Sequence, residues 1–190
     1  SLAIDDTQLE TYAQPLRAQG HDFKAYPRTN DTAALIEEAK DADILMLANM
    51  PLPLEVIEHC PHLKYINIAF TGVDHVPVAA AKSRGILVSN ASGYSTRAVS
   101  ELTMGMILTL LRQIREGDER CRQGMTKDGL TGYELFGKTV GIIGTGAIGM
   151  HTIKLCQAFG CNILAYNGFT PGKSEAGITY LPLYPLLEQS

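Results

Sequence analysis

Residues 139–167, TVGIIGTGAIGMHTIKLCQAFGCNILAYN, decide the fold of the surrounding chain. Residues 139–143 predict a strand, and the amphipathic segment 147–159 predicts a helix. The apolar run 162–166 predicts a second strand, which would return parallel to the first. A strand, a glycine-rich turn, a helix and a parallel strand form the unit with which α/β proteins bind phosphate groups.

The turn at 144–149 has the pattern G-x-G-x-x-G, and each glycine has a physical reason. Gly144 would permit the tight turn, Gly146 would let the backbone approach a pyrophosphate, and Gly149 would let the helix and strand pack closely. The helix N-terminus offers N–H groups and a partial positive charge to the phosphates. A glycine-rich turn that binds nothing is the alternative. The predicted cofactor-binding residues of this turn are Gly144, Thr145, Gly146, Ala147, Ile148 and Gly149.

Asn167 stands where the second strand ends, at the position of the acidic residue that holds the adenosine ribose of NAD. An amide can bond a hydroxyl group but carries no charge to repel a 2′-phosphate. An NADP site usually adds an arginine just after this position, whereas here Lys173 is the nearest cation. We therefore include Asn167 among the cofactor-binding residues, and the sequence slightly favours NAD without excluding NADP.

Composition bounds the class of protein. The 190 residues are 45% hydrophobic and 19% charged, which is typical of a folded chain of one or two domains. The net charge of -4 and the lack of a basic run argue against nucleic acid, and no apolar run is long enough to span a bilayer. No secretory signal opens the chain, so we expect a cytoplasmic protein whose four cysteines are reduced thiols and which binds no metal.

Residues 1–93 are expected to form a first domain of alternating strands and helices. Helices are predicted at 8–20, at 31–41 with Asp31 or Thr32 as N-cap, at 53–60 and at 77–85. The run 42–49 is continuously apolar, as in a strand buried on both faces. About five parallel strands are predicted, at residues 1–4, 21–26, 42–49, 63–70 and 86–90.

Residues 94–190 are expected to form a second domain that begins with one long helix, from Thr96 to about Met125. The first half of this helix is apolar almost all round and should be buried, either between domains or subunits or in the core of one subunit. After the strand at 162–166 come a loop, a short strand and a last helix. Because a doubly wound dinucleotide fold needs about six strands, we expect this chain to be the front part of a longer protein.

Three blocks of sequence occur in order: FTGVDHVPVAAAKSRGILVSNASGYSTRAVSELTMGMILTLLR at 70–112, the glycine turn, and NILAYN. Together they resemble the D-isomer-specific 2-hydroxyacid dehydrogenases, and GYST looks most like the glycerate dehydrogenase or hydroxypyruvate reductase branch. The resemblance implies an α/β fold: a flavodoxin-like substrate domain followed by the front part of a Rossmann dinucleotide-binding domain, both with parallel sheets. It also implies NAD as cofactor, a small 2-hydroxy or 2-oxo acid as substrate, and a homodimer.

The same resemblance assigns further residues. Thr71 and Gly72 match the loop whose backbone N–H groups bind the substrate carboxylate, although Gly72 could merely shape a turn. Tyr94 matches a substrate contact and could instead be a packed aromatic residue. Val99 and Thr103 match positions near the nicotinamide, and Val99 is equally suited to a core.

The catalytic imidazole, acidic residue and arginine of the family would lie beyond Ser190, so no catalytic residue is assigned in this chain. Its histidines stand outside the family's catalytic context, although His75 follows the substrate loop and could line the cleft. The chain alone is therefore expected to be inactive. A chain without the catalytic set would also suit a second function, that of an NAD-sensing scaffold or corepressor-like protein.

Overall fold

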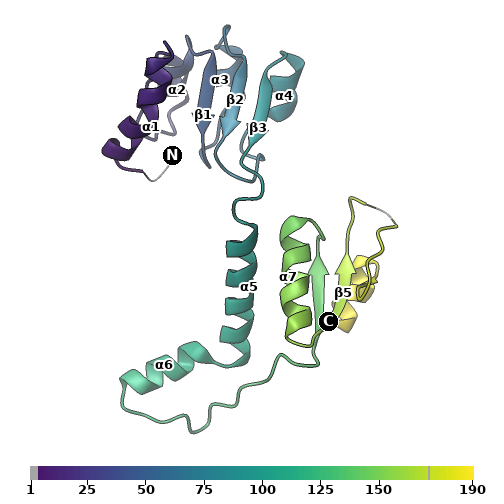
Figure 1. Cartoon of the computed structure of the whole chain (residues 1–190). Coiled ribbons are helices and arrows are strands. Elements are labelled where there is room, and N and C mark those ends of the chain that lie inside the picture. Colours follow the sequence, from purple (N-terminus) through teal and green to yellow (C-terminus); the bar gives the residue numbers. More distant parts are fainter. Residues whose placement is uncertain (1–3, 171) are drawn as a thin grey trace. The chain divides into compact units, whose positions relative to one another are not determined.

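The computed structural model describes residues 4–170 and 172–190, and the chain divides into two compact units, Ser1–Ser92 and Gly93–Ser190. Both units are α/β, and each contains a three-stranded parallel sheet (Figure 1). The α/β class with parallel sheets that the sequence predicts is therefore confirmed.

The first unit is built on a sheet in the order β1-β2-β3. Side chains alternate along its strands: Leu47, Ile66 and Ile68 are buried in one core with the helices, whereas Ile44 and Met46 are 56% and 59% exposed. The strands are β1 Ile44–Leu47, β2 Tyr65–Ile68 and β3 Leu87–Asn90, and the helices are α1 Asp6–Ala18, α2 Thr32–Ala39, α3 Leu54–Glu58 and α4 Val78–Ser83.

Local signals set the helix ends in this unit. The carboxylate of Asp31 accepts a hydrogen bond from the Ala33 N–H at 3.0 Å, which identifies Asp31 as the N-cap of α2. Gly20 and Gly85 follow α1 and α4 with φ of +88° and +73°, a left-handed conformation that glycine adopts without steric cost. These helices lie where the sequence predicts them.

Two predictions for the first unit are wrong. No strand forms at residues 21–26, where only Phe23 is partly buried, so the segment has no apolar face to place on a core. The segment 42–49 does form a strand, but its Ile44 and Met46 face is exposed, so it is not buried on both faces. Of the strand predicted at 1–4, residues 1–3 lie outside the described residues, and Ile4 is not in a strand.

The second unit has a sheet in the order β4-β5-β6, with β4 Thr139–Ile143, β5 Asn162–Tyr166 and β6 Thr179–Tyr180. The helices α7 Ala147–Ala158 and α8 Leu183–Gln189 cover opposite faces. A Cβ on Gly141 would meet Leu186 and Ser190 at the end of the chain, whereas the next residue, Ile142, packs toward Gly149 of α7. The strand, helix and parallel strand predicted from residue 139 onward are confirmed, as are the short strand and last helix.

The single long helix predicted from Thr96 is two helices, α5 Thr96–Leu111 and α6 Ile114–Arg122. They are separated by Gln113, which has φ of 50°. The backbone N–H of Tyr133 donates to the Leu111 carbonyl at 2.8 Å, and the Gln113 side-chain amide donates to the Thr131 carbonyl at 2.9 Å. The connector before β4 therefore binds the end of α5 and takes a carbonyl that a continuous helix would use.

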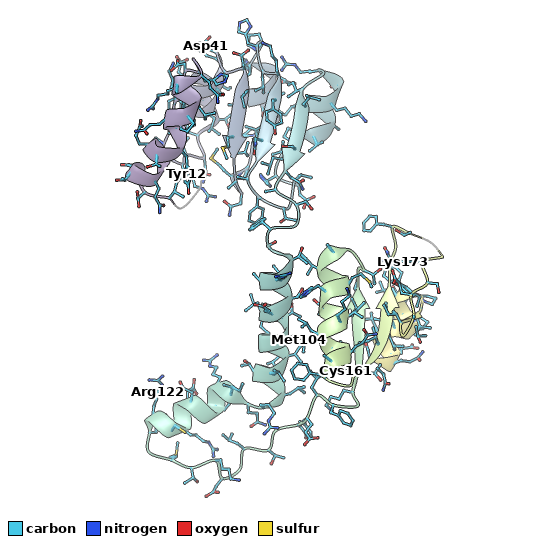
Figure 2. The ribbon with its side chains drawn as sticks, viewed as in Figure 1. Tyr12, Asp41, Met104, Arg122, Cys161 and Lys173 are labelled. Carbon is cyan, nitrogen blue, oxygen red and sulfur yellow. The ribbon has the colours of Figure 1, made fainter. Side chains whose placement is uncertain are left out.

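One face of α5 packs on α7, and the rest of the helix is exposed. Met104 is 6% exposed, and its Sδ lies 3.6 Å from Sγ of Cys156 on α7. Met104 and Cys161, both labelled in Figure 2, belong to the same apolar cluster. In contrast, Leu102, Met106 and Leu110 are 63%, 54% and 78% exposed. The alternative of a helix buried all round in the core of one subunit is therefore wrong, and burial between domains or subunits stays a prediction.

All four cysteines are free thiols, as predicted. Burial raises the pKa of the Cys60, Cys156 and Cys161 thiols above its usual value, so these side chains stay protonated near neutral pH. A search of the helices in the described part of the chain finds none long and apolar enough to cross a membrane.

Candidate functional site

The glycine turn lies at the carboxyl ends of β4 and β5, where parallel α/β sheets bind their ligands. The N–H of Gly144 donates to the Tyr166 carbonyl at 2.8 Å, which ties the start of the turn to the end of β5. Gly144 has φ of +95°, a backbone conformation that residues other than glycine rarely adopt. The turn therefore requires glycine at this position for its own backbone.

The other two glycines of the motif have different surroundings. A Cβ on Gly149 would lie 2.0 Å from the Gly144 carbonyl oxygen, so α7 can pack on the turn only with glycine there. A Cβ on Gly146 would meet no protein atom within 4 Å, and Gly146 is not in a left-handed conformation. The protein itself does not require glycine at position 146, so open space above the turn is left for a ligand.

Gly146 is also the N-cap of α7, and Ala147 and Ile148 form its first turn. The first N–H groups of a helix have no partner within the helix, and the helix dipole adds a partial positive charge at this end. Thr145 is only 3% exposed, so it contributes backbone and packing to the turn. Helix N–H groups, an open face and no side chain at Gly146 fit a pyrophosphate group.

Ser100 connects α5 to this turn, and the sequence analysis missed it. Its side chain is fully buried, and its single hydroxyl proton is shared between the Thr96 carbonyl at 2.7 Å and the Ile148 carbonyl at 3.3 Å. Thr152 also donates to the Ile148 carbonyl, at 3.0 Å. A small polar residue within an otherwise apolar helix is the signal that could have indicated this contact.

Val99 and Thr103 lie on α5 one residue before and three residues after Ser100, whose hydroxyl bonds the Ile148 carbonyl in the first turn of α7. Val99 is 38% exposed, and therefore it is not a core residue here. The Thr103 hydroxyl donates to the Val99 carbonyl at 2.8 Å.

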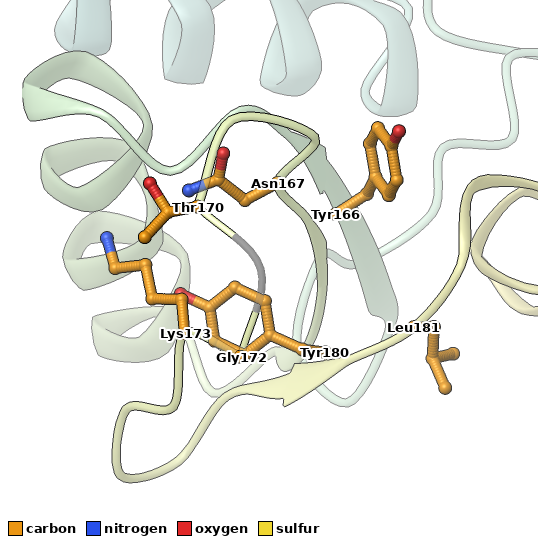
Figure 3. Close-up of a pocket in the computed structure, with 7 residues that line it drawn as sticks. All are labelled: Tyr166, Asn167, Thr170, Gly172, Lys173, Tyr180 and Leu181. Atoms are coloured by element: carbon orange, nitrogen blue, oxygen red, sulfur yellow. The ribbon is translucent and has the colours of Figure 1, made fainter.

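A pocket of about 210 Å³ opens beside the turn, at the end of β5 (Figure 3). Asn167 lines it, and the Asn167 amide donates to the Thr145 hydroxyl at 3.0 Å while its carbonyl accepts from the Phe169 N–H at 3.1 Å. Lys173 lines it too, and its ammonium donates to the Thr145 carbonyl at 2.7 Å. The structure thus brings together Asn167, Thr145 and a cation that the sequence only placed nearby.

The predicted substrate loop lies in the first unit, between β2 and α4. The Asn90 side-chain amide donates to the Thr71 carbonyl at 2.7 Å, which holds the loop against the end of β3. A Cβ on Gly72 would meet nothing within 4 Å, so the space beside this glycine is open. The His75 ring lies edge-on to Phe70 with centroids 6.5 Å apart.

Tyr94 belongs to the second unit, directly before α5, and is 64% exposed. It is therefore not a packed aromatic residue within this chain, which was the alternative to a substrate contact. Among the described residues, no group of three or more His, Cys, Asp or Glu side chains could hold a metal ion.

The chain is similar in sequence to known proteins. Residues 2–176 match the family described as D-isomer specific 2-hydroxyacid dehydrogenase, catalytic domain. The chain is 40% identical to a D-3-phosphoglycerate dehydrogenase of Methanocaldococcus jannaschii over 72% of its own length and 26% of that protein. It is 33% identical to a hydroxypyruvate reductase of Blautia hydrogenotrophica over 87% of its length and 54% of that protein. It spans about half, or less, of the length of these relatives.

Two solved structures are similar to this chain over most of its length. An acyclic imino acid reductase in complex with NADPH and D-Arg matches 94% of this chain and 58% of its own, with a TM-score of 0.85 and 26% identity. A D-lactate dehydrogenase of Aquifex aeolicus, complexed with NAD and lactic acid, matches 98% of this chain and 56% of its own, with a TM-score of 0.83 and 27% identity.

Proposed function

Because this chain belongs to the family of D-isomer-specific 2-hydroxyacid dehydrogenases, we propose that it supplies the cofactor-binding part of an NAD(P)-dependent oxidoreductase. The proposed reaction transfers a hydride between the nicotinamide and a small D-2-hydroxy acid or its 2-oxo acid. The family resemblance that the sequence motifs suggest is confirmed by the match over residues 2–176. We further propose that the whole protein is a cytoplasmic homodimer that acts on such acids.

One observation carries the proposal: the turn at 144–149 leaves open space at the single glycine that its own packing does not need. Gly144 and Gly149 are required by backbone conformation and by a 2.0 Å approach, whereas Gly146 faces no protein atom. Glycine at such a position is expected where a ligand comes close to the backbone. We assign Gly146, Ala147 and Ile148 to the pyrophosphate and Asn167 to the adenosine ribose.

A bound nicotinamide cofactor would supply or accept the hydride. The residues of this chain would bind and orient the two reactants. Backbone N–H groups at the start of α7 would hold the phosphates, and those of Thr71 and Gly72 would hold the substrate carboxylate. Val99 and Thr103, beside the first turn of α7, are proposed to pack near the nicotinamide, and Tyr94 is proposed to contact substrate.

Proton transfer has no assigned residue in this chain. The His75 ring packs edge-on against Phe70. The arginine, acidic residue and histidine implied by the resemblance match no position here. We therefore propose that the 190-residue chain binds cofactor but does not turn over alone.

The homodimer proposal is supported by the exposed apolar side chains of α5. Leu102, Met106 and Leu110 lie on one helix and are each more than half exposed. Burying such side chains against a second copy would be favourable by about 25 cal/mol for each Å² of apolar area removed from water.

The test uses NADH binding and NADH oxidation. The 190-residue chain should bind NADH, measured by calorimetry, and should oxidise it with glyoxylate, hydroxypyruvate or pyruvate only feebly, if at all. A longer chain that carries the arginine, acidic residue and histidine implied by the resemblance should show the reaction. Turnover by the 190-residue chain at an ordinary enzymatic rate would refute the assignment of the catalytic groups elsewhere. Binding that changes the size of the assembly, with no turnover by that longer chain, would instead favour the sensor function.

A further inference from the structure

The pocket at the end of β5 is lined by Lys173, a cation, and by Asn167, which stands where an acidic residue is usual. Lys173 reaches back from the loop after β5, and its side chain is 22% exposed. Its ammonium donates to the carbonyl of Thr145, within the glycine turn. The lysine is therefore positioned at the site itself, although it follows Asn167 by six residues in the sequence (Figure 3).

The local charge favours an anion. Asn167 carries no charge, and its amide is bonded to the Thr145 hydroxyl and the Phe169 N–H. The carboxylate of Glu175 lies 3.9 Å from the Lys173 ammonium, and the Glu175 side chain is 44% exposed to water. An ammonium has three N–H donors, so bonding the Thr145 carbonyl leaves donors that can turn to a ligand.

Two hydroxyl groups complete the pocket. The Tyr180 side chain lines it, and its hydroxyl is buried without a hydrogen-bond partner among the described residues. Thr170 lines the same pocket. A buried hydroxyl without a partner is costly unless a ligand or water satisfies it. Lys173 and Thr170 line a pocket of about 210 Å³, with the unpartnered Tyr180 hydroxyl buried in its wall, and a cation and hydroxyl groups suit a phosphate.

We propose that Lys173 is a specificity-determining residue, through which the site takes the 2′-phosphate of NADP and so binds NADPH at least as well as NADH. The proposal deepens the proposed function and rests on it, because it requires the adenosine ribose to lie beside Asn167. The neutral Asn167 avoids the repulsion that an acidic residue would impose on the phosphate, and Lys173 supplies the attraction.

The test uses fragments of the cofactor, so it does not depend on turnover. Adenosine 2′,5′-bisphosphate and adenosine 5′-monophosphate are titrated into the 190-residue chain by calorimetry, followed by NADPH and NADH. The bisphosphate should bind about 10-fold or more tightly than the monophosphate, the effect of one or two charge-assisted hydrogen bonds. Lys173→Met should remove most of this difference and leave monophosphate affinity within about 2-fold.

Two further variants separate charge from structure. Lys173→Arg keeps the positive charge and should retain tight bisphosphate binding. Asn167→Asp keeps the shape of the side chain but adds a negative charge, so it should weaken the bisphosphate more than the monophosphate. The circular dichroism spectrum of each variant should match that of the unaltered chain, which shows that the fold is kept.

The outcomes distinguish the two proposals. If the monophosphate and NADH bind but Lys173→Met leaves bisphosphate affinity unchanged, the role of Lys173 is overturned and the cofactor site stands. If the chain binds none of the four ligands, the proposed cofactor site is overturned, and the inference with it.

Discussion

Replacing Gly149 by alanine would place a Cβ 2.0 Å from the carbonyl oxygen of Gly144 and 3.1 Å from its carbonyl carbon. Both atoms belong to the backbone, so no flexible side chain can move aside. Since Cβ atoms essentially never lie within 3.0 Å of a non-bonded heavy atom outside their own and neighbouring residues, α7 and the turn would have to separate by about 1 Å. Gly149→Ala therefore tests whether the turn holds the helix by direct backbone contact.

The expected cost follows from that displacement. Forcing extra atoms into a packed site costs about 1–3 kcal/mol, and a clash with backbone belongs at the upper end of this range. Alanine gains up to about 1 kcal/mol over glycine inside a helix, which offsets part of the cost. We expect Gly149→Ala to lower the free energy of unfolding by about 2 kcal/mol.

Gly146→Ala is the matched control. Its Cβ would meet no protein atom within 4 Å, so the free energy of unfolding should stay within about 0.5 kcal/mol of the unaltered chain. The same methyl group would occupy the space assigned to the pyrophosphate, and NADH affinity should fall about 10-fold or more. The two alanines should therefore separate stability from binding.

Urea unfolding followed by circular dichroism measures the first quantity, and calorimetric titration with NADH measures the second. Because the two units can unfold separately, hydrogen exchange of amides in β4 and α7 assigns the loss to the second unit. A Gly149→Ala chain as stable as the original would refute the packing argument. Unchanged NADH affinity in Gly146→Ala would refute the placement of the phosphates.

Three further predictions concern other parts of the chain. Leu102→Gln on α5 should raise the monomer fraction in light scattering, whereas Leu54→Gln, at an exposed leucine of the first unit, should not; a dimer that persists in both contradicts the proposed interface. Ser100→Ala removes the hydroxyl that donates to the Ile148 carbonyl and should lower the free energy of unfolding by about 1 kcal/mol, measured in urea, so no change would contradict its role. Burial raises the pKa of the Cys60 thiol in the folded chain. In the unfolded chain the thiol loses its proton above about pH 8.5, whereas in the folded chain it stays protonated to higher pH. The contribution of this thiol to the free energy of unfolding is therefore largest below that pH, and it is lost as pH rises through the folded pKa. Between pH 7 and 10 the urea midpoint of Cys60→Ala should fall less steeply than that of the unaltered chain.

Local patterns explain why much of the fold could be predicted. The Asp31 cap, the left-handed Gly85 and the strand–turn–helix from residue 139 all depend on neighbours close in the sequence. Such features are determined by backbone conformation and hydrogen bonds within a few residues, which a single sequence displays directly.

The predictions that are wrong concern features that depend on segments far apart in the sequence. The break after α5 depends on Tyr133, which donates to the Leu111 carbonyl from 22 positions further along the chain. The apolar pattern of α5 indicates that its side chains favour burial but not which partner buries them, and Leu102 remains exposed in this chain. Ser100 was missed for the same reason, because its acceptor, the Ile148 carbonyl, lies on another helix.

Asn167 shows why the charge of a site is harder to predict than its shape. The asparagine amide donates to the Thr145 hydroxyl, and its carbonyl accepts from the Phe169 N–H. A carboxylate could keep both contacts, since the Thr145 hydroxyl can donate as well as accept. Exchanging amide for acid at this position would therefore alter the charge beside Lys173 more than the geometry of the turn. The position of Lys173 depends on how the loop after β5 folds back to the Thr145 carbonyl, which no local pattern in the sequence displays. A motif can thus locate the ribose of a dinucleotide, while the choice between a hydroxyl and a phosphate depends on a residue outside the motif.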